Sequence, residues 1–449
     1  MVFREGWGRR VPAGPRCTGM TWRRPRKGLP PARLGAMEMR GLEWEVPAEN
    51  SQSVTRPTRL DETPAVESLP FGERIPRKRK HRRTRAKAGP KFAVLGAGHG
   101  GLAMAGHLAY MGFRVNLWNR TAERIEQIRL RGGIELEGAI EGEGRLEIAT
   151  SDLKEAIADV KVIMVALPAD AHRDIAMALA DVIQDGQVIV LNPGRTGGAI
   201  EVRNVLTQKG ASADVTIAEA QTFLYTSRRI EPTSAHIFDI KNGVAVAALP
   251  SYKTPEVLKL LRTAFPQFIP GDNVLRTGLE NVGAIFHPAV MILNAARIES
   301  THGDFQYYLE GITPSVAAIL EAMDRERVQV ADALGIRAHT AREWLYLTYG
   351  SPGKDLYQSI QSTPGYKGIM APAHLNHRYI LEDIPMSLVP IASIGEMLGV
   401  KAPTIRAMIH LASIIHGKDF WKEGRTVERL GIKGLSVKDI RFLAVGAST

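Results

Sequence analysis

The chain of 449 residues contains a single cysteine and no long uninterrupted run of apolar residues. The one cysteine, Cys17, lies close to the N-terminus, so the rest of the chain can form neither a disulfide, a cysteine-based metal cluster nor a catalytic thiol. No stretch approaches the roughly 18 consecutive apolar residues of a membrane-spanning helix. We therefore expect a cytoplasmic protein that holds no metal and does not enter a membrane.

Excess positive charge is also missing from most of the chain, although the formal net charge is +11. Residues 1–90 contain 21 Lys and Arg against 9 Asp and Glu. Residues 91–449 contain 37 Lys and Arg against 38 Asp and Glu. The first 90 residues are rich in Pro, Arg and Gly and lack periodicity, which predicts a disordered basic extension. Because the body that follows is neutral, we expect it to bind no nucleic acid.

The basic extension ends in a run of cations at Arg77–Arg83, which would attract polyanions. Three other interpretations stay open. The extension is a solvated segment without a partner, or translation starts at Met37 or Met39, or the Arg-rich first residues resemble a transit peptide.

The segment KFAVLGAGHGGLAMA, Lys91–Ala105, places the pattern G-x-G-x-x-G between an apolar strand and a helical pattern. Gly96 permits the turn, Gly98 lets a pyrophosphate approach the backbone, and Gly101 lets the helix pack closely on the strand. The helix N-terminus then faces the phosphates with free N–H groups. The predicted cofactor-binding residues of this loop are Gly96, Gly98, His99, Gly100 and Gly101.

A second predicted strand, Phe113–Trp118, ends in Asn119, Arg120 and Thr121. An NAD-specific site usually has Asp or Glu at this point for the ribose 2′-hydroxyl, and none is present. A neutral Asn followed by Arg suits a 2′-phosphate instead, so Asn119, Arg120 and Thr121 predict NADP(H) in preference to NAD(H). The alternative is that Arg120 is a solvated cation and that the protein uses either cofactor.

Continuous apolar runs at 160–167, 187–191 and 215–218 predict further buried strands that alternate with helices. This alternation is typical of a doubly wound parallel sheet, which binds ligands at the carboxyl ends of its strands. Two loops follow such ends, at 168–172 and 192–198. Leu167 and Pro168, at the start of the first loop, are predicted to bind the cofactor.

Beyond about Leu275 the pattern becomes helical. Predicted helices cover 278–299, 314–334, 388–398, 403–416 and 437–444. We therefore expect three parts: a disordered extension at 1–90, an α/β Rossmann-type dinucleotide-binding domain at 91–275, and an all-α substrate domain at 276–449. A ligand cleft would lie between the two folded domains.

Two polar groups in the helical region are candidates for chemistry. His287 stands before Pro288 inside an apolar helix, where proline predicts a kink, and Asn294 lies two turns further along the same face. In a second cluster, Arg378 could bind a carboxylate through two hydrogen bonds, and Asp383 could orient a histidine. The alternatives are a structural core histidine and a surface loop of ion pairs.

Four blocks of sequence are similar to the octopine/nopaline (opine) dehydrogenases. They are Ala218–Arg228 (AEAQTFLYTSR), Asn281–Asn294 (NVGAIFHPAVMILN), Tyr307–Val316 (YYLEGITPSV) and Arg378–Pro390 (RYILEDIPMSLVP). The first block is placed in the linker between sheet and helices. The resemblance covers about residues 90–435 and implies a helical domain of the 6-phosphogluconate-dehydrogenase type.

This resemblance implies that His287 and Asp383 form an acid/base pair and that Arg378 binds substrate. Asn294 and Tyr225 are the other predicted substrate-binding residues, although the family commonly has Pro-Tyr where this chain has Leu224-Tyr225. The family reductively joins an amino acid to a 2-oxo acid, giving a secondary amine dicarboxylate. We therefore expect an NAD(P)H-dependent opine dehydrogenase, and whether it forms a homodimer stays open.

Two other functions stay open. The first is another reductase of the 6-phosphogluconate-dehydrogenase type, acting on a 2-oxo acid or a polyol, but such enzymes use a lysine at the start of the helical domain. Between Asn242 and Lys354 the only lysines are Lys253 and Lys259, which lie too early. The second is a non-catalytic NADP-binding regulator.

Overall fold

A computed structural model describes residues 89–446 of the chain. The predicted disordered extension, including the basic run Arg77–Arg83, lies outside the described residues except for its last two positions. The described residues belong to one compact unit. No helix among the described residues is both long enough and apolar enough to cross a membrane.

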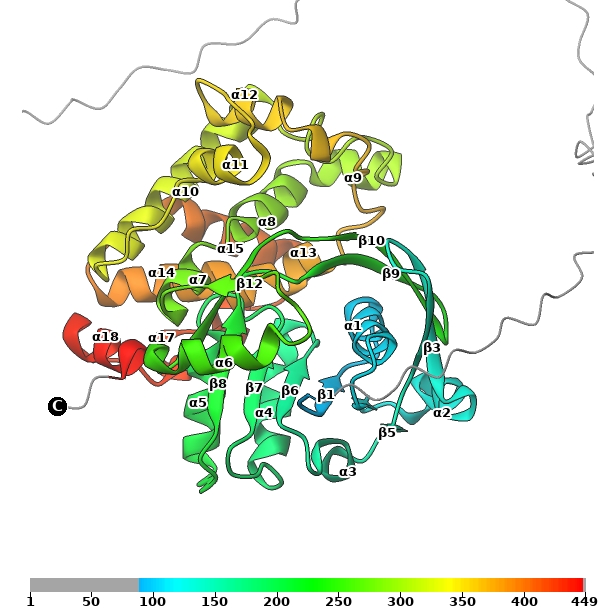
Figure 1. Ribbon diagram of the computed structural model, residues 1–449. Coiled ribbons are helices and arrows are strands. Elements are labelled where there is room, and N and C mark those ends of the chain that lie inside the picture. The colour runs from blue at the N-terminus through cyan, green and yellow to red at the C-terminus, as the bar shows by residue number, and fades with distance from the viewer. Residues whose placement is uncertain (1–88, 447–449) are drawn as a thin grey trace, which may run out of the picture. The chain divides into compact units, whose positions relative to one another are not determined.

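The central element is an eight-stranded sheet with the order β12-β11-β8-β7-β6-β1-β2-β5 (Figure 1). All neighbours pair in parallel except β11, which runs antiparallel to β8. The strands are β1 (Phe92–Leu95), β2 (Val115–Trp118), β5 (Ile148–Thr150), β6 (Val162–Val165), β7 (Val188–Leu191), β8 (Thr216–Ala220), β11 (Val244–Leu249) and β12 (Phe268–Pro270). Because β1 leads to β2 on one side and lies beside β6 on the other, the switch point of the sheet falls between β1 and β6.

Helices cover both faces of this sheet. Strand β1 is therefore fully buried, and its alternate side chains enter two different cores. Phe92 and Val94 join one core with α1 (His99–Tyr110), α2 (Glu126–Arg131) and α6 (Thr254–Leu261). Ala93 and Leu95 join the other with α3 (Leu153–Ile157), α4 (His172–Ala180) and α5 (Gly198–Gln208). The predicted doubly wound α/β domain is therefore confirmed.

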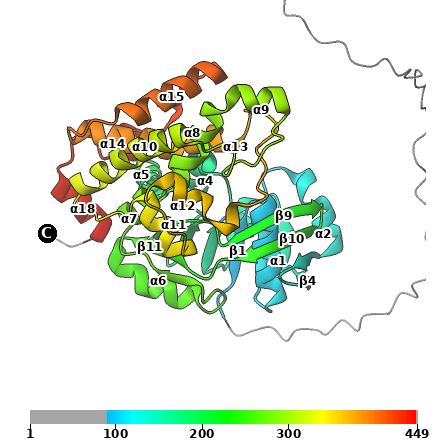
Figure 2. The ribbon, with the colours of Figure 1, turned by 90° about the horizontal axis from the view of Figure 1, so that it is seen from above.

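A second sheet, with the order β4-β3-β10-β9, was not predicted from the sequence. Its strands are β3 (Gly133–Gly138), β4 (Gly142–Arg145), β9 (Tyr225–Glu231) and β10 (Ser234–Ile240). Strands β9, β10, β3 and β4 all contact α1, and Figure 2 shows the small sheet on that side of the molecule. The block Ala218–Arg228 is thus not a linker to the helices, since it ends β8 and begins β9.

The helical part, residues 274–446, begins with α7 (Val274–Leu279), α8 (Gly283–Leu293) and α9 (Ala295–Thr301). The prediction of a single helix at 278–299 is therefore wrong. The helical backbone is interrupted at 280–282 and again at Asn294, where the backbone leaves the helical region. The remaining helices are α10 (Pro314–Ala333), α11 (Ala341–Tyr349), α12 (Leu356–Gln361), α13 (Arg378–Leu381), a π-helical turn (Ile384–Leu388), α14 (Val389–Met397), α15 (Pro403–His416), α16 (Phe420–Glu423), α17 (Val427–Leu430) and α18 (Val437–Val445).

The helical part and the sheet part, residues 89–273, share one hydrophobic core. Buried residues from α8, α10, α14 and α15 belong to the same cluster as Leu95, Leu191 and Ile200. The chain then returns to the sheet part, because α17 packs against α5 and α18 against β11 (Figure 1). Side chains from the two parts can therefore meet in a fixed geometry.

Candidate functional site

The glycine loop between β1 and α1 has the shape that the sequence predicts. Gly96 adopts φ of +114°, which side chains rarely adopt. A Cβ atom at position 101 would lie 1.8 Å from the carbonyl oxygen of Gly96, so only glycine fits there. A Cβ atom at position 98, in contrast, would meet no protein atom within 4 Å. The backbone at Gly98 is thus open to a ligand, and the N–H groups of the first turn of α1 are suitable donors to a phosphate.

The end of β2 is tied to this loop by Asn119. Its Oδ1 accepts a hydrogen bond of 3.1 Å from the amide N–H of Ala97, and its Nδ2 donates one of 3.0 Å to the carbonyl oxygen of Thr121. Arg120 is exposed and has no ion-pair partner among the described residues. Asn119 therefore fixes the turn, and Arg120 is an exposed cation at the end of β2.

The small sheet covers the same loop from the other side. The ring of Phe223 lies where a side chain at Gly100 would be, and the Nδ1 of His99 accepts a 2.9 Å hydrogen bond from the amide N–H of Arg229. Burial, and then the charges of Arg228, Arg229 and Arg378, lowers the pKa of His99. The surroundings of the glycine loop are thus positive, which favours anionic ligands.

Leu167 and Pro168 lie across the glycine loop at the end of β6. The Leu167 side chain reaches within 2.9 Å of the position that a Cβ atom at Gly96 would take. Pro168 then begins a short helical turn at Ala169–Ala171. Both residues therefore stand at the switch point, beside the loop that is expected to hold the cofactor.

His287 and Asp383 lie 96 residues apart in the chain and meet in the structure. The His287 Nδ1 is 2.9 Å from the Asp383 Oδ2. The Asp383 carboxylate is fully buried, whereas 21% of the His287 side chain is exposed. Helix α8 continues through His287 and Pro288, so proline does not end it there. A buried carboxylate that accepts from Nδ1 leaves the other ring nitrogen, Nε2, for a ligand.

Two tyrosines hold the histidine in place. The ring of Tyr379, on α13, stacks on the His287 imidazole with a centroid distance of 4.1 Å. The hydroxyl of Tyr307 donates a 2.5 Å hydrogen bond to the His287 carbonyl oxygen. Tyr307 therefore stabilises the backbone at the candidate catalytic residue.

Arg378 lies near this pair, on the first turn of α13. Its Nε and Nη2 donate to the Glu382 Oε2 at 2.9 and 2.6 Å, and 57% of its side chain is exposed. Because Nη1 makes no hydrogen bond to a described residue, one edge of the guanidinium is available to a carboxylate.

Arg195 is a site residue that was not identified from the sequence. It belongs to the loop after β7, and its Nη1 lies 2.8 Å from the Asp383 Oδ1. The sequence did indicate that loop, 192–198, as one that follows the carboxyl end of a strand. No local pattern shows, however, that this arginine reaches a residue of the helical part.

Two predicted substrate-binding residues make contacts within the fold. Tyr225 is buried, donates to or accepts from His107 Nδ1 at 2.9 Å, and packs against Phe265. The amide of Asn294 donates to the carbonyl oxygens of Val290 and Gly311, both at 2.9 Å. Tyr225 is therefore a core residue of the sheet part, and Asn294 ends α8.

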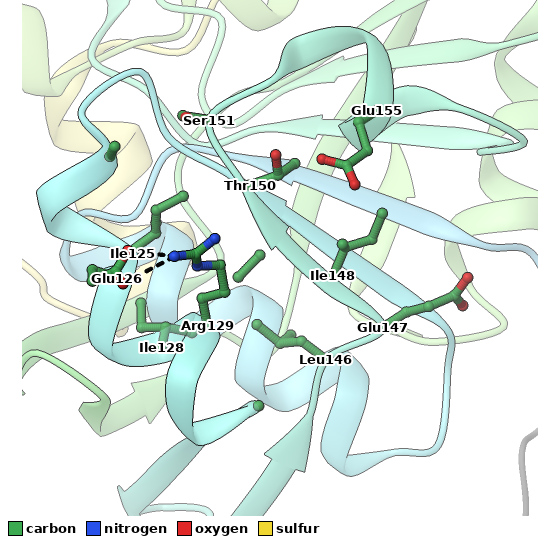
Figure 3. A pocket seen from close by; sticks show the side chains of 13 residues that line it. Ile125, Glu126, Ile128, Arg129, Leu146, Glu147, Ile148, Thr150, Ser151 and Glu155 are labelled. Atoms are coloured by element: carbon green, nitrogen blue, oxygen red, sulfur yellow. Dashed lines mark hydrogen bonds and ion pairs between the residues drawn. The ribbon is translucent and has the colours of Figure 1, made fainter.

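A cavity of about 350 Å³ lies elsewhere, between α2 and β5 (Figure 3). Its wall is half polar and half apolar, with Ile125, Ile128 and Ile148 among the apolar lining residues, and the ion pair between Arg129 and Glu126 lies at it. None of the predicted site residues lines it. No group of three or more His, Cys, Asp or Glu side chains within residues 89–446 could hold a metal ion.

Fold and site together define the class of protein. A Rossmann-type domain with a glycine loop is followed by a helical domain that supplies a His–Asp pair, as in two-domain NAD(P)-dependent oxidoreductases. The family model of the NAD/NADP octopine/nopaline dehydrogenase α-helical domain matches residues 270–416. That of the NAD-dependent glycerol-3-phosphate dehydrogenase N-terminus matches residues 91–194.

The chain belongs to the opine dehydrogenase family. It is 42% identical over 351 residues to the opine dehydrogenase of Arthrobacter sp. (strain 1C), covering 78% of this chain and 97% of that protein. It is similar in fold to octopine dehydrogenase in a structure with NADH and L-arginine, with a TM-score of 0.67, 23% identity, and coverage of 80% and 99%. A yersinopine dehydrogenase structure with NADP⁺ gives a TM-score of 0.62, 15% identity, and coverage of 78% and 99%. The protein is thus an NAD(P)-dependent oxidoreductase acting on CH–NH donors.

Proposed function

We propose that this protein reduces the imine formed between an amino acid and a 2-oxo acid, with NADPH as the preferred cofactor. The observation that carries this proposal is the pairing of His287 with Asp383, beside the arginine Arg378. The imine forms by loss of water, and its reduction to a secondary amine needs one hydride and one proton. The bound cofactor supplies the hydride.

His287 is suited to supply the proton. With Nδ1–H directed to Asp383, its Nε2 can accept a hydrogen bond when neutral and donate one when protonated. Such proton transfer contributes about 10²–10⁴ in rate. Asp383 would hold the ring in one tautomer and stabilise its charged form, and the stacked Tyr379 would restrict its rotation.

Arg378 is suited to bind a substrate carboxylate through its free edge. Both reactants in the proposed reaction carry a carboxylate next to the reacting atoms. Glu382 fixes the guanidinium on its other edge, so the arginine would be held in position before substrate arrives.

The preference for NADP(H) rests on the free cation Arg120 at the end of β2, where no acid is present. Arg229 supports it from the small sheet, because its guanidinium donates to the carbonyl oxygens of Ala97 and Arg124 and pairs with no carboxylate among the described residues. Burial, and then the charge of Arg124, lowers the pKa of Arg229. A 2′-phosphate would relieve this repulsion between cations.

The test is a matrix of 2-oxo acids against amino acids, in which oxidation of NADPH is followed by absorbance. We expect oxidation when both substrates are present and none with either alone. Oxidation with a 2-oxo acid alone would favour a simple 2-oxo acid reductase. Cofactor binding without turnover over the whole matrix would favour a non-catalytic NADP-binding protein. The His287→Ala variant is the matched control for background oxidation.

A further inference from the structure

Arg195 connects the sheet part to both carboxylates of the candidate site. Its Nη1 lies 2.8 Å from the Asp383 Oδ1, and its Nε donates to the Glu382 Oε1 at 3.2 Å. The other oxygen of Asp383 lies 2.9 Å from His287. The Asp383 carboxylate is therefore held between an arginine from one part of the molecule and the histidine from the other.

The loop that carries Arg195 is fixed in an uncommon conformation. Arg195 has φ of +59°, in the left-handed region that non-glycine residues rarely adopt. Its neighbour Thr196 donates from the amide N–H to the Met386 carbonyl oxygen at 3.3 Å and from Oγ1 to the Gly278 carbonyl oxygen at 2.9 Å. Arg425 donates to the Gly194 carbonyl oxygen at 3.0 Å. Contacts on both sides thus hold the backbone in this conformation.

The charges around Asp383 show why a cation is needed there. Glu382 and Asp383 are adjacent and buried, and two buried carboxylates without cations would be strongly unfavourable. Arg378 approaches Glu382 from the exposed side, whereas Arg195 is 9% exposed and reaches both carboxylates. The other titratable groups facing Asp383 are His287 on α8, Tyr379 on α13, and Tyr307.

The shifts of two groups agree with this arrangement. Burial acts to raise the pKa of Glu382, but the charges of Arg195 and Arg378, together with their hydrogen bonds, lower it to about 2. Burial acts to lower the pKa of the Arg195 guanidinium, but the charges of Asp383 and Glu382 raise it above its ordinary value. Arg195 therefore stays a cation.

We propose that Arg195 is a positioning residue for the His287–Asp383 pair, supplying the counter-charge of Asp383 and fixing its orientation. Arg195 forms an ion pair with Oδ1, while Oδ2 faces the imidazole and favours the tautomer with the proton on Nδ1. The tautomer of His287, in the helical part, is then determined by Arg195, in the sheet part. Arg195 reaches this pair only when the two parts are docked. The effect on turnover rests on the proposed function, whereas the effect on the tautomer does not.

The test uses the full chain with ¹⁵N-labelled histidine, in Arg195→Gln and Arg195→Lys variants. The ring-nitrogen signals of His287, assigned with a His287→Asn variant, report the tautomer without substrate. We expect Arg195→Gln to lose the preference for Nδ1–H and to lower kcat about 10²-fold. We expect its dissociation constant for NADPH to change less than about threefold, because Arg195 faces Asp383 rather than the glycine loop. Arg195→Lys should have a higher kcat than Arg195→Gln but a lower one than wild type, since an ammonium keeps the positive charge but lacks the planar, two-pronged donor geometry of a guanidinium.

Arg327→Gln is the matched control. Arg327 is likewise an arginine of the interior, fully buried and paired with Asp324 at 2.7 Å. This variant should lower the melting temperature but leave the His287 tautomer and kcat unchanged. An unaltered tautomer in Arg195→Gln, or a kcat within about threefold of wild type, would overturn the proposal. If the wild-type chain turns over no substrate pair, the proposed function fails, and the tautomer still decides the role of Arg195.

Discussion

The imidazole of His287 lies flat against the ring of Tyr379, with the two ring planes 12° apart and their centroids 4.1 Å apart. Tyr379 in turn contacts the ring of Tyr307, whose hydroxyl donates to the His287 carbonyl oxygen. The histidine is thus restrained at its ring face by one tyrosine and at its backbone by another. Its Nδ1 contacts Asp383.

This stack predicts that the ring of Tyr379 matters more than its hydroxyl. Tyr379→Phe keeps the stacked surface, so kcat should stay within about threefold of wild type. Tyr379→Ala frees the imidazole to rotate, and kcat should fall about tenfold or more. Steady-state kinetics on both variants separate the two contributions. Equal losses in both would indicate that the hydroxyl, rather than the ring, acts in the reaction.

The pair itself makes a stronger prediction. His287→Ala should lower kcat by about 10²-fold or more, because the lost interaction belongs to the transition state. Asp383→Asn should be nearly as harmful, since an amide at this position favours the wrong tautomer. Neither change touches the glycine loop, so the dissociation constant for NADPH should stay near that of wild type. A kcat equal to that of wild type in either variant would show that the His287–Asp383 pair does not take part in proton transfer.

The two glycines of the loop should differ in their response to a methyl group. Gly101→Ala places Cβ 1.8 Å from a backbone oxygen, so both the melting temperature and cofactor affinity should fall. Gly98→Ala meets no protein atom within 4 Å and should leave the melting temperature unchanged. It should still weaken NADPH binding, because the methyl group occupies the space expected for the pyrophosphate. Full affinity in Gly98→Ala would place the cofactor elsewhere.

Arg120 should determine the choice between NADPH and NADH. Removing a charged partner of the 2′-phosphate costs about 1.5–3 kcal/mol, so Arg120→Ala should weaken NADPH binding about tenfold or more and leave NADH binding unchanged. Arg129→Ala is the control, since Arg129 is an exposed arginine that pairs with Glu126 on α2. Titration of each protein with both cofactors gives the ratio. Wild type that binds NADH as tightly as NADPH would contradict the prediction from the end of β2.

The sequence predicted those parts of the fold and site that depend on local patterns. The run Phe92–Leu95 followed by three glycines identified the first βα unit, because the turn and the close packing require glycine at fixed spacings. His287 and Asp383 were linked only through the resemblance to a family, since nothing local brings together residues 96 positions apart.

Other features could not be predicted because they depend on distant contacts. Strand β3 pairs with β10, about 100 residues later, and its sequence Gly133–Gly138 lacks the apolar run of a buried strand. Tyr225 lies in a block that resembles substrate-binding sequence, but its contacts with His107 and Phe265 exist only after the small sheet has formed. Arg195 likewise depends on docking of the two parts.

A buried carboxyl of the sheet part, Glu219, gives a prediction about stability. It is 1% exposed, and it accepts hydrogen bonds from the Thr277 hydroxyl at 2.7 Å and the Ala199 amide at 2.9 Å. Burial raises the pKa of Glu219 from 4.5 to about 7, outweighing these hydrogen bonds. Its contribution to stability is therefore complete below about pH 4.5 and is lost as the pH rises through about 7.

Glu219→Gln removes this titration. Relative to wild type, the free energy of unfolding of the variant should increase by on the order of 3 kcal/mol between about pH 4.5 and about pH 8. Glu201→Gln is the control, because the pKa of Glu201 is shifted in the opposite direction to that of Glu219. Burial acts to raise the pKa of Glu201, but the charges of Arg425 and Arg429 lower it, so this variant should be less stable at neutral pH because two arginines lose their carboxylate. Urea unfolding over this pH range measures both. Parallel pH profiles for wild type and Glu219→Gln would show that Glu219 does not titrate in this range, and that its two hydrogen bonds offset the cost of burying its charge.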